Sequence, residues 1–501
     1  MQFSSGGVKL YISIPSISLL VYFALKLYQE LSAENVNLFT NENKKFWLIT
    51  IVVLCLWVLM SGIGSFMYQN SDFVARNPMY RDLCTYEWPV IYDLSQQSDA
   101  VKAITGSGTV AFSYYLTYWL PPALLSKIFS FDELGRNVSL YFYTVIGIFL
   151  TLYNLCRYFK KTSYAILTVF IFFSGMDVIG YVCQRILPDA AQANGSGYLR
   201  IFSVLIYEHF EWWAGLFQYS SNTSLLFWVF NQSVGVWLIV ILFLQVRSNK
   251  NSLALSSLTF AYSAWAVFGM IPLALWSAFK IHKKFRDAFT LQNILIPLLI
   301  LIVYGSFYLT GNGAQGKPFY LNVKNTEDLY VYVLFILLEF GIYMLIMGKT
   351  AVKYDFYHVV LIELLLFPFY TFDGNLIMRE TISTLFVLMV LVLKFLFEKD
   401  TSLRKRKIVL VIALAIGAYT PVSEMNRSII GTTVHVLKEH NMLPNALAQK
   451  AQNLNVKFLR NELYTLGNLT VFDNEELIRG YKNTFFAYGY EDSFFFKYLA
   501  K

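Results

Sequence analysis

The stretch from Ser65 to Asp93 holds residue types that can do chemistry at a membrane surface. It reads SFMYQNSDFVARNPMYRDLCTYEWPVIYD and directly follows a strongly apolar segment. Asp72 comes close to the end of that segment, where a carboxylate is both solvated and held, so it is a candidate catalytic base. Two simpler roles stay open, because Asp72 is equally placed to be a solvated loop carboxylate or the partner of Arg76 at a helix start.

A short helix is predicted within this stretch. Asn77 precedes Pro78, which disfavours the α region at Asn77 and suits a helix with Pro at its first position. We expect the helix to run over about 78–88 and to lie along the membrane interface, with Arg81 and Glu87 facing water or headgroups.

Acidic, histidine and tryptophan side chains gather between Tyr207 and Trp228. His209 and Glu211 lie next to Trp212. One interpretation is an aromatic belt at the membrane boundary with solvated acids. The other is a wall that binds a sugar or a lipid, because aromatic faces stack on the apolar faces of sugar rings. No spacing fixes three or four metal ligands, so no metal-binding residue is predicted, and Mg²⁺ or Mn²⁺ stays open as a cofactor.

Two further ionisable groups fall near the ends of apolar segments. Asp177 lies in FFSGMDVIGY, and an acid within a span is costly and marks a functional site unless it reaches the wet surface. Arg379 follows a turn that contains Asp373, at the start of the next span. Either Arg379 pairs with Asp373 or Glu380, or its guanidinium holds a phosphate at the membrane surface.

The composition indicates a membrane protein built from many helices. Of the 501 residues, 56% are hydrophobic and 14% are charged, whereas a soluble domain has about 25% charged residues. Apolar runs of about 20 residues recur, which predicts an all-α polytopic membrane protein. The net charge of +8 comes from Lys and Arg in short loops, so it does not indicate a nucleic-acid partner. The four cysteines form no C-x-x-C pair, so neither a disulfide framework nor a thiolate metal site is expected.

The basic loops orient the predicted spans. The spans cover about 8–28, 46–67, 138–158, 163–183, 223–245, 290–311, 328–348, 355–371, 376–397 and 407–421. Eighteen Lys and Arg residues lie in the short connections of one side, against nine in the longer loops of the other. The positive-inside rule places the first side in the cytoplasm. The loops at 68–107 and 184–222 and the C-terminal tail are then expected on the extracytoplasmic face of the plasma membrane.

Two apolar segments do not fit a simple span. Segment 110–131 must begin and end on the outer side and holds a Pro-Pro pair, so we expect a re-entrant or interfacial helix pair. Segment 253–279 has basic loops on both sides. We expect it to form two short helices that enter from the cytoplasm, turn near Gly269 and Pro272, and return.

Two domains are expected. Residues 1–421 would form the transmembrane domain. Residues 422–501 are mostly polar and helix-forming, and they end in FFAYGYEDSFFFKYLAK, which is too aromatic for a free tail. We expect a small extracytoplasmic helical domain, too small to bury much core alone, whose aromatic end packs onto the membrane domain.

The layout of residues 46–400 resembles the GT-C superfamily of integral-membrane glycosyltransferases. A span is followed by an outer loop with an acidic residue near its start, and then by SYYLTYWLPPALLSKIF and GRNVSL. Two spans joined by RYFKK come next, and a Pro-broken pair of short helices follows later. The resemblance implies a GT-C-like bundle of about 10–12 transmembrane and re-entrant helices, with interfacial helices in the first outer loop.

The resemblance also implies a reaction. A sugar would pass from a polyprenyl-phosphate-linked donor to a cell-surface glycan or lipid acceptor on the extracytoplasmic face, with inversion at the sugar carbon. Asp72 would be the general base, an effect worth roughly 10²–10⁴ in rate. Arg379 would hold the lipid phosphate. The residues expected to assist in binding are Arg76, Arg81, Arg200, His209, Glu211, Trp212, Asp177 and Asp373.

Other classes of protein stay open. A lipid-linked glycan flippase or transporter would need a charged path through the membrane, whereas the unusual polar groups of this chain gather at one face. A different cell-envelope polymerase, ligase or phospho-transferase would need an outer-face Ser, Thr or His nucleophile beside a base, which the sequence does not clearly show. A structural membrane scaffold would need none of these groups.

Overall fold

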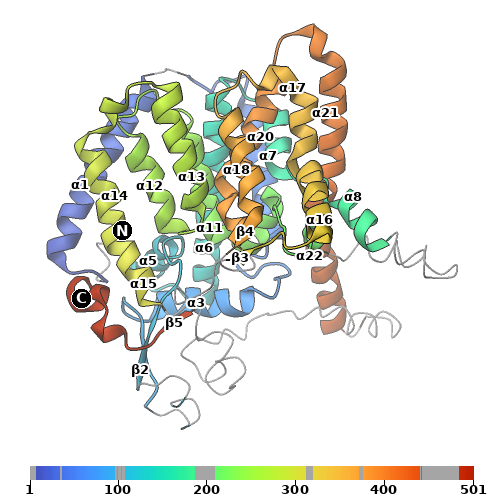
Figure 1. Cartoon of the computed structure of the whole chain (residues 1–501). Helices are drawn as coiled ribbons and strands as arrows, with labels where there is room; N and C mark the ends of the chain where they lie inside the picture. Colours follow the sequence, from blue (N-terminus) through green and yellow to red (C-terminus); the bar gives the residue numbers. More distant parts are fainter. Residues whose placement is uncertain are drawn as a thin grey trace.

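The chain forms a helical membrane protein, as its apolar runs predict (Figure 1). A computed structural model describes residues 7–33, 36–95, 99, 103, 108–186, 209–311, 320–371, 376–440, 442 and 485–501. Within these ranges, seven helical segments are long and apolar enough to cross a membrane. They are Leu10–Ser32, Glu133–Tyr158, Tyr164–Gln184, Asn222–Phe243, Leu291–Thr310, Thr326–Ala351 and Thr401–Leu437. Shorter apolar helices cover Ser252–Tyr262, Ala266–Ile281, Tyr357–Phe369 and Ile382–Leu396.

The helices follow the apolar runs, and several of the runs are broken into two helices. The helices of the first part of the chain are α1 (Leu10–Ser32), α2 (Lys44–Met60), α3 (Phe73–Thr85), α5 (Leu120–Ile128), α6 (Glu133–Tyr158), α7 (Tyr164–Phe172) and α8 (Asp177–Tyr181). The middle part holds α11 (Asn222–Phe243), α12 (Ser252–Tyr262), α13 (Ala266–Trp276), α14 (Leu291–Ile300), α15 (Ser306–Thr310), α16 (Thr326–Ile336) and α17 (Ile342–Ala351). The last part holds α18 (Tyr357–Leu366), α19 (Leu376–Glu380), α20 (Ile382–Leu396), α21 (Arg404–Gly417) and α22 (Tyr419–Glu439).

The two ends of the bundle differ in chemistry (Figure 1). One end, called the α3 end here, carries α3, a small sheet and the C-terminal segment. The opposite end, called the basic end, holds the α17–α18 and α20–α21 connections. These connections carry Lys349, Lys353, Lys399 and Arg404. The basic end therefore contains residues that the charge distribution predicts to be cytoplasmic.

Two small sheets complete the structure. One pairs β1 (Ile91–Asp93) with β2 (Thr109–Phe112), and β2 with β5 (Phe486–Ala487), all antiparallel. The other pairs β3 (Tyr320–Leu321) with β4 (Tyr370–Thr371). β5 belongs to the aromatic C-terminal segment, whose Leu499 carbonyl accepts a hydrogen bond from the Lys9 amide at 2.9 Å. The end of the chain is thus packed against its beginning at the α3 end.

The apolar segment that contains α7 is interrupted near the middle of the bundle. α7 ends at Phe172, residues 173–176 are not helical, and α8 begins at Asp177. Such a break frees backbone carbonyl groups, which need donors away from water. The first residues of α11 supply them, because the Asn222 amide donates to Phe170 O at 2.8 Å and the Thr223 hydroxyl donates to Ile171 O at 2.7 Å.

α11 is sharply bent, although the sequence predicts one straight span over 223–245. Val229 has non-helical backbone angles. Ser233 Oγ donates to Val229 O and also to Leu225 O, both at 3.2 Å. Residues eight apart lie about 12 Å apart along a straight helix, so the chain must turn sharply at Val229. α11 therefore starts inside the bundle, reaches an apex near Phe227–Phe230, and then runs on to Phe243.

The predicted pair of short helices at 253–279 is present, with its break in a different place. α12 and α13 are separated at 263–265, and Pro272 lies inside α13. The two ends of this helix pair meet. The side-chain Nδ2 of Asn249, just before α12, donates to Ala278 O at 3.3 Å and to Lys284 O at 3.1 Å, both beyond the end of α13. The Ser263 hydroxyl donates to Gln232 at 2.9 Å. Polar partners at Ser263, rather than the proline, mark the turn.

Segment 110–131 differs from the predicted helix pair. Its first residues form β2, and only Leu120–Ile128 is helical, as α5. The Pro-Pro pair lies in the first turn of α5, where proline is tolerated. α3 also begins earlier than predicted, at Phe73, so that Pro78 lies inside it. Burial of Phe73, Met79 and Leu83 against the bundle outweighs the local effect of this proline.

The turn between α2 and α3 is held by glycines and amide side chains. Gly62 and Gly64 have φ angles of 80° and 86°. The Gln69 amide donates to Gly62 O at 2.8 Å. Gln69 and Asn77 also exchange side-chain hydrogen bonds of 2.7 and 3.3 Å. This network places the start of α3 relative to the end of α2.

We expect Gly62→Ala to lower the free energy of unfolding by about 1–3 kcal/mol, because an L side chain is strained at this φ angle. The added Cβ would also lie 2.4 Å from Tyr68 O. The measurement is the melting temperature of the purified protein in detergent, followed by tryptophan fluorescence. Gly108→Ala is the control, since a Cβ there meets no heavy atom within 4 Å. Equal melting temperatures for the two variants would contradict this account.

Candidate functional site

Asp72 stands at the start of α3 with a partly open side chain. The side chain is 44% exposed, and its Oδ2 lies 2.6 Å from Nη2 of Arg76. The backbone amide of Asp72 donates to Asn70 Oδ1 at 3.0 Å. The side-chain Nδ2 of Asn70 in turn donates to Phe227 O at 2.8 Å. Asp72 makes no capping hydrogen bond to the helix. The carboxylate is thus held by its neighbours while part of it stays accessible.

Arg76 is buried between two aromatic rings. Its guanidinium carbon lies 5.6 Å from the ring centroid of Phe73 and 5.5 Å from that of Phe230. Its Nη1 has no hydrogen-bond acceptor among the described residues. The pairing of Asp72 with Arg76 at a helix start, which the sequence left open, is present. Arg76 therefore acts first as an anchor for Asp72, and its phosphate-binding role stays a prediction.

The other predicted cationic residues form no ion pair with Asp72 within the described residues, or they lie outside the described residues. Arg81 is half-buried further along α3. Arg379 lies in α19, and its Nε has no acceptor within the described residues. No hydrogen bond or ion pair in that part of the chain joins Arg379 to Asp72. Arg200 and Asp373 lie outside the described residues.

A second charged group, called the Glu424 cluster, lies beside the apex of α11. Nδ1 of His209 lies 2.7 Å from Oε1 of Glu424. Trp228 Nε1 donates to Oε2 of Glu424 at 3.1 Å, and Arg427 bonds the same oxygen. The Arg427 guanidinium lies 5.2 Å from the Trp228 ring. Trp212 is 54% exposed and covers His209, with ring centroids 4.6 Å apart.

Glu211 lies next to this cluster and is buried. It accepts hydrogen bonds from the Ser221 amide at 2.9 Å and from Gln218 Nε2 at 3.2 Å. Nε2 of His209 lies 3.8 Å away. Burial raises the pKa of Glu211 above its ordinary value. Burial alone would lower the pKa of His209, but the Glu424 carboxylate outweighs it and raises that pKa. His209 and Glu211 are therefore not the solvated groups of an aromatic belt.

Two segments, α22 and the apex of α11, contact both the start of α3 and the Glu424 cluster. Tyr68 donates its backbone amide to Thr432 Oγ1 at 3.0 Å, and a Cβ at Gly431 would meet the Tyr68 ring. Asn70 bonds the carbonyl of Phe227, and Phe227 directly precedes Trp228 of the cluster. α22 and the apex of α11 thus hold both groups at the α3 end.

Asp177 and Glu339 lie further from the α3 end, and both are buried. Oδ2 of Asp177 accepts hydrogen bonds from Ser174 and Thr420, each at 2.9 Å. Trp213 Nε1 donates to Oε1 of Glu339 at 3.0 Å. Thr420 lies four residues before Glu424 on α22, which is about one helical turn or 6 Å along the helix axis. Asp177 is therefore an interior group, not a wet one at a helix end.

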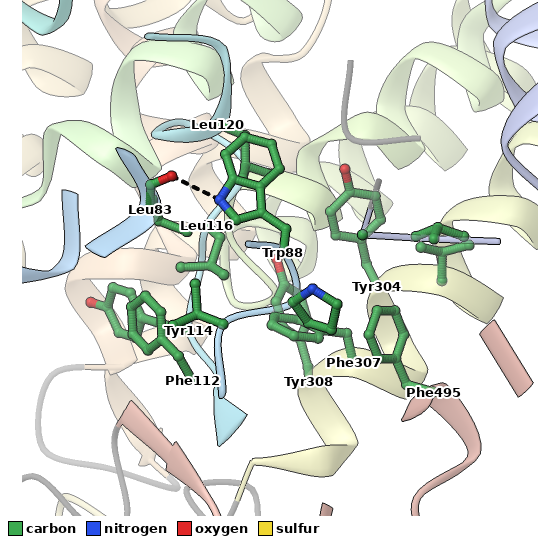
Figure 2. Close-up of a pocket in the computed structure, with 15 residues that line it drawn as sticks. Leu83, Trp88, Phe112, Tyr114, Leu116, Leu120, Tyr304, Phe307, Tyr308 and Phe495 are labelled. Atoms are coloured by element: carbon green, nitrogen blue, oxygen red, sulfur yellow. Dashed lines mark hydrogen bonds between the residues drawn. The ribbon is translucent and has the colours of Figure 1, made fainter. Parts of the chain in front are cut away.

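An aromatic groove lies at the other end of α3 (Figure 2). It holds about 70 Å³ of free space and is partly open to the surroundings. Its walls come from α3, α5, the segment 301–310 that ends in α15, and the two chain termini. They include Leu83, Trp88, Leu116, Tyr304, Phe307 and Phe495. Trp88 is fixed by a 2.8 Å hydrogen bond to Leu83 O, and Lys127 Nζ lies 4.9 Å from its ring. The lining suits an apolar hydrocarbon chain of a bound molecule.

Sequence reasoning missed Glu424 and Arg427. It ended the last span at residue 421, whereas α22 runs from Tyr419 to Glu439 and carries both residues beyond that boundary. Glu424 and Arg427 lie three residues apart, a spacing that lets an acid and a cation pair on one face of a helix, and this spacing was the available signal. Within the described part of the chain, no group of three or more His, Cys, Asp and Glu side chains is arranged to hold a metal ion.

Comparison with protein-family models, with curated proteins and with solved structures finds no match to this chain.

We expect the thermal stability of the protein to fall as the pH rises through the raised pKa of His209. The ordinary pKa is 6.5 and the folded value is higher. The His209–Glu424 ion pair therefore contributes fully below about pH 6.5 and is lost above the folded pKa. Melting temperatures measured across this range for the wild type and for His209→Gln give the contribution of the pair as their difference. Exposed His440→Gln is the control, and a His209→Gln profile parallel to the wild type would refute the assignment.

Proposed function

We propose that this chain is a membrane glycosyltransferase of the GT-C type. It would move a sugar from a polyprenyl-phosphate-linked donor to a cell-surface glycan or lipid acceptor. The main support is the placement of Asp72, a half-exposed carboxylate at the end of a membrane bundle that is held by Arg76 and Asn70. A carboxylate held in this way has the position that a general base needs.

The proposed reaction uses few protein groups. Asp72 takes the proton from an acceptor hydroxyl as the hydroxyl oxygen bonds to the anomeric carbon of the sugar. The bond between that carbon and the phosphate oxygen breaks, and the polyprenyl phosphate leaves with both bonding electrons. Attack from the face opposite the leaving group inverts the anomeric centre. Cationic groups near the phosphate would stabilise its developing charge, and Arg379 is the candidate for this role.

The aromatic groove is the candidate site for the lipid part of the donor. Leu83 in its wall and Asp72 belong to the same helix and lie about 16 Å apart along its axis. The apolar lipid tail of the donor would then lie at one end of α3, and its reacting headgroup would lie at the other end. The basic end of the bundle would face the cytoplasm, which puts α3 and Asp72 on the extracytoplasmic face of the plasma membrane.

A lipid-linked glycan flippase or transporter is the second candidate. Asp177 and Glu339 favour it, because they place ionisable groups well inside the bundle, where transporters use such groups. The two functions are separated by reconstitution into liposomes with a labelled polyprenyl-phosphate sugar. Transfer of the label to an acceptor supports the enzyme, and movement of the intact donor between leaflets without transfer supports the carrier.

We expect Asp72→Asn to reduce sugar transfer by at least about 10²-fold, since the amide cannot take up the acceptor proton. Transfer is measured with purified protein and a panel of polyprenyl-phosphate sugars. Elution from gel filtration and the melting temperature show whether the fold is kept. Glu87→Gln changes an exposed acid just beyond the same helix and should transfer normally. Wild-type turnover in Asp72→Asn would reject its role as the base.

We expect Arg379→Ala to weaken donor binding at least about tenfold while acceptor affinity changes little, because only the donor carries the lipid phosphate. Affinities are measured by competition with polyprenyl phosphate and with the acceptor. Arg404→Ala at the basic end removes the same charge far from the proposed site and is the matched control. Donor affinity equal to that of the control would remove this role from Arg379.

A further inference from the structure

Asp177 and Glu339 form a buried pair of acids at the helix break 173–176. Asp177 is the first residue after the break, and Glu339 lies on η7 (Leu337–Gly341) between α16 and α17. The two side chains are 1% and 2% exposed. The break is fixed to the neighbouring helix, because the Met176 amide donates to Leu338 O at 3.1 Å and Tyr343 Oη donates to Ser174 O at 2.7 Å.

Each acid keeps one oxygen without a donor. Oδ1 of Asp177 and Oε2 of Glu339 accept no hydrogen bond from an amide, hydroxyl or ring N–H group of the described residues. Oε2 of Glu339 points at the break, since a Cβ on Gly175 would lie only 1.8 Å from it. The two carboxyl groups are close enough to interact directly. Glycine at this position is what allows Glu339 to approach the backbone.

The side chains that the structure describes around this pair carry little positive charge. The other ionisable groups that act on this pair are Glu211 and His209. His209 is already bonded to Glu424, which also holds Arg427. Among the residues that the structure describes, the carboxyl groups of Asp177, Glu339, Glu211 and Glu424 therefore share the cationic side chains of His209 and Arg427. Two neighbouring carboxylates in an apolar interior repel strongly and lose their hydration, so they must be neutralised either by protonation or by a bound cation.

We propose that Asp177 and Glu339 hold one monovalent cation, either an alkali metal ion or a proton, between Oδ1 of Asp177 and Oε2 of Glu339. An alkali ion takes hard oxygen ligands, and non-helical backbone inside a membrane bundle is a common place for such sites. A proton would join the two carboxyl groups by a short hydrogen bond. In both cases the bound charge ties α8 to the α16–α17 span and stabilises the break, independently of the proposed sugar transfer.

The experiment measures occupancy directly in purified protein in detergent. For an alkali ion, the melting temperature is recorded as sodium or potassium chloride replaces choline chloride at constant ionic strength, together with binding of radioactive sodium. A ligand that binds only the folded state raises the melting temperature by mass action. We expect a rise of several degrees for one alkali ion, which Glu339→Gln and Asp177→Asn abolish. For a proton, we expect an infrared band of a protonated carboxyl that both variants remove.

Glu363→Gln is the matched control. Glu363 is also a buried acid in a membrane helix, but its partner is the hydroxyl of Thr384 rather than a second carboxyl. This variant should keep the sodium or potassium effect and the band assigned to the Asp177–Glu339 pair. The proposal is overturned if the wild type binds no alkali ion and if neither Glu339→Gln nor Asp177→Asn removes a carboxyl band. Because neither readout depends on sugar transfer, this result is separate from the fate of the proposed function.

Discussion

Backbone groups that leave a helix inside a membrane bundle must find partners in the protein, and this constraint organises the structure. The break at 173–176 frees carbonyl groups of α7, and the start of α11 supplies Asn222 and Thr223 to bond them. To place those side chains, α11 must begin inside the bundle and turn sharply at Val229. The turn creates the apex at Phe227–Phe230, which holds the start of α3. The interior break and the surface site are therefore parts of one arrangement.

The same apex explains why Asp72 is well positioned. Phe227 accepts a bond from Asn70, and Phe230 covers the guanidinium of Arg76. Both contacts act on the residues that hold Asp72. A reacting group is most useful when its supporting residues are themselves fixed by packing and hydrogen bonds. The exposed part of the carboxylate is then free for chemistry while its position is set from within the bundle.

Some of this arrangement could be predicted from the sequence, and the reasons for the rest are physical. Long apolar runs predicted the helical membrane class, and basic loops on both sides of 253–279 predicted a pair of short helices. Periodicity could not reveal the bend at Val229, because the bend depends on the hydrogen bonds of Ser233 to Val229 O and Leu225 O, which a hydropathy pattern does not record. It also could not show that His209 is buried, since its partner Glu424 lies more than 200 residues away. Contacts between distant segments decide these features.

The surface carboxylate and the buried pair of acids make different demands on a function. A base for glycosyl transfer must reach an acceptor from water, which suits Asp72, with a side chain that is 44% exposed. A group in a transport path must exchange its ligand between two sides, whereas Asp177 and Glu339 are enclosed and bonded to Thr420 and Trp213. An enclosed cation at a helix break is a means of stabilising irregular backbone, and it does not require a path through the membrane. A bundle with such a break can therefore serve an enzyme at its surface, because the residues that bond the break, Asn222 and Thr223, also begin the helix that carries the apex beside Asp72.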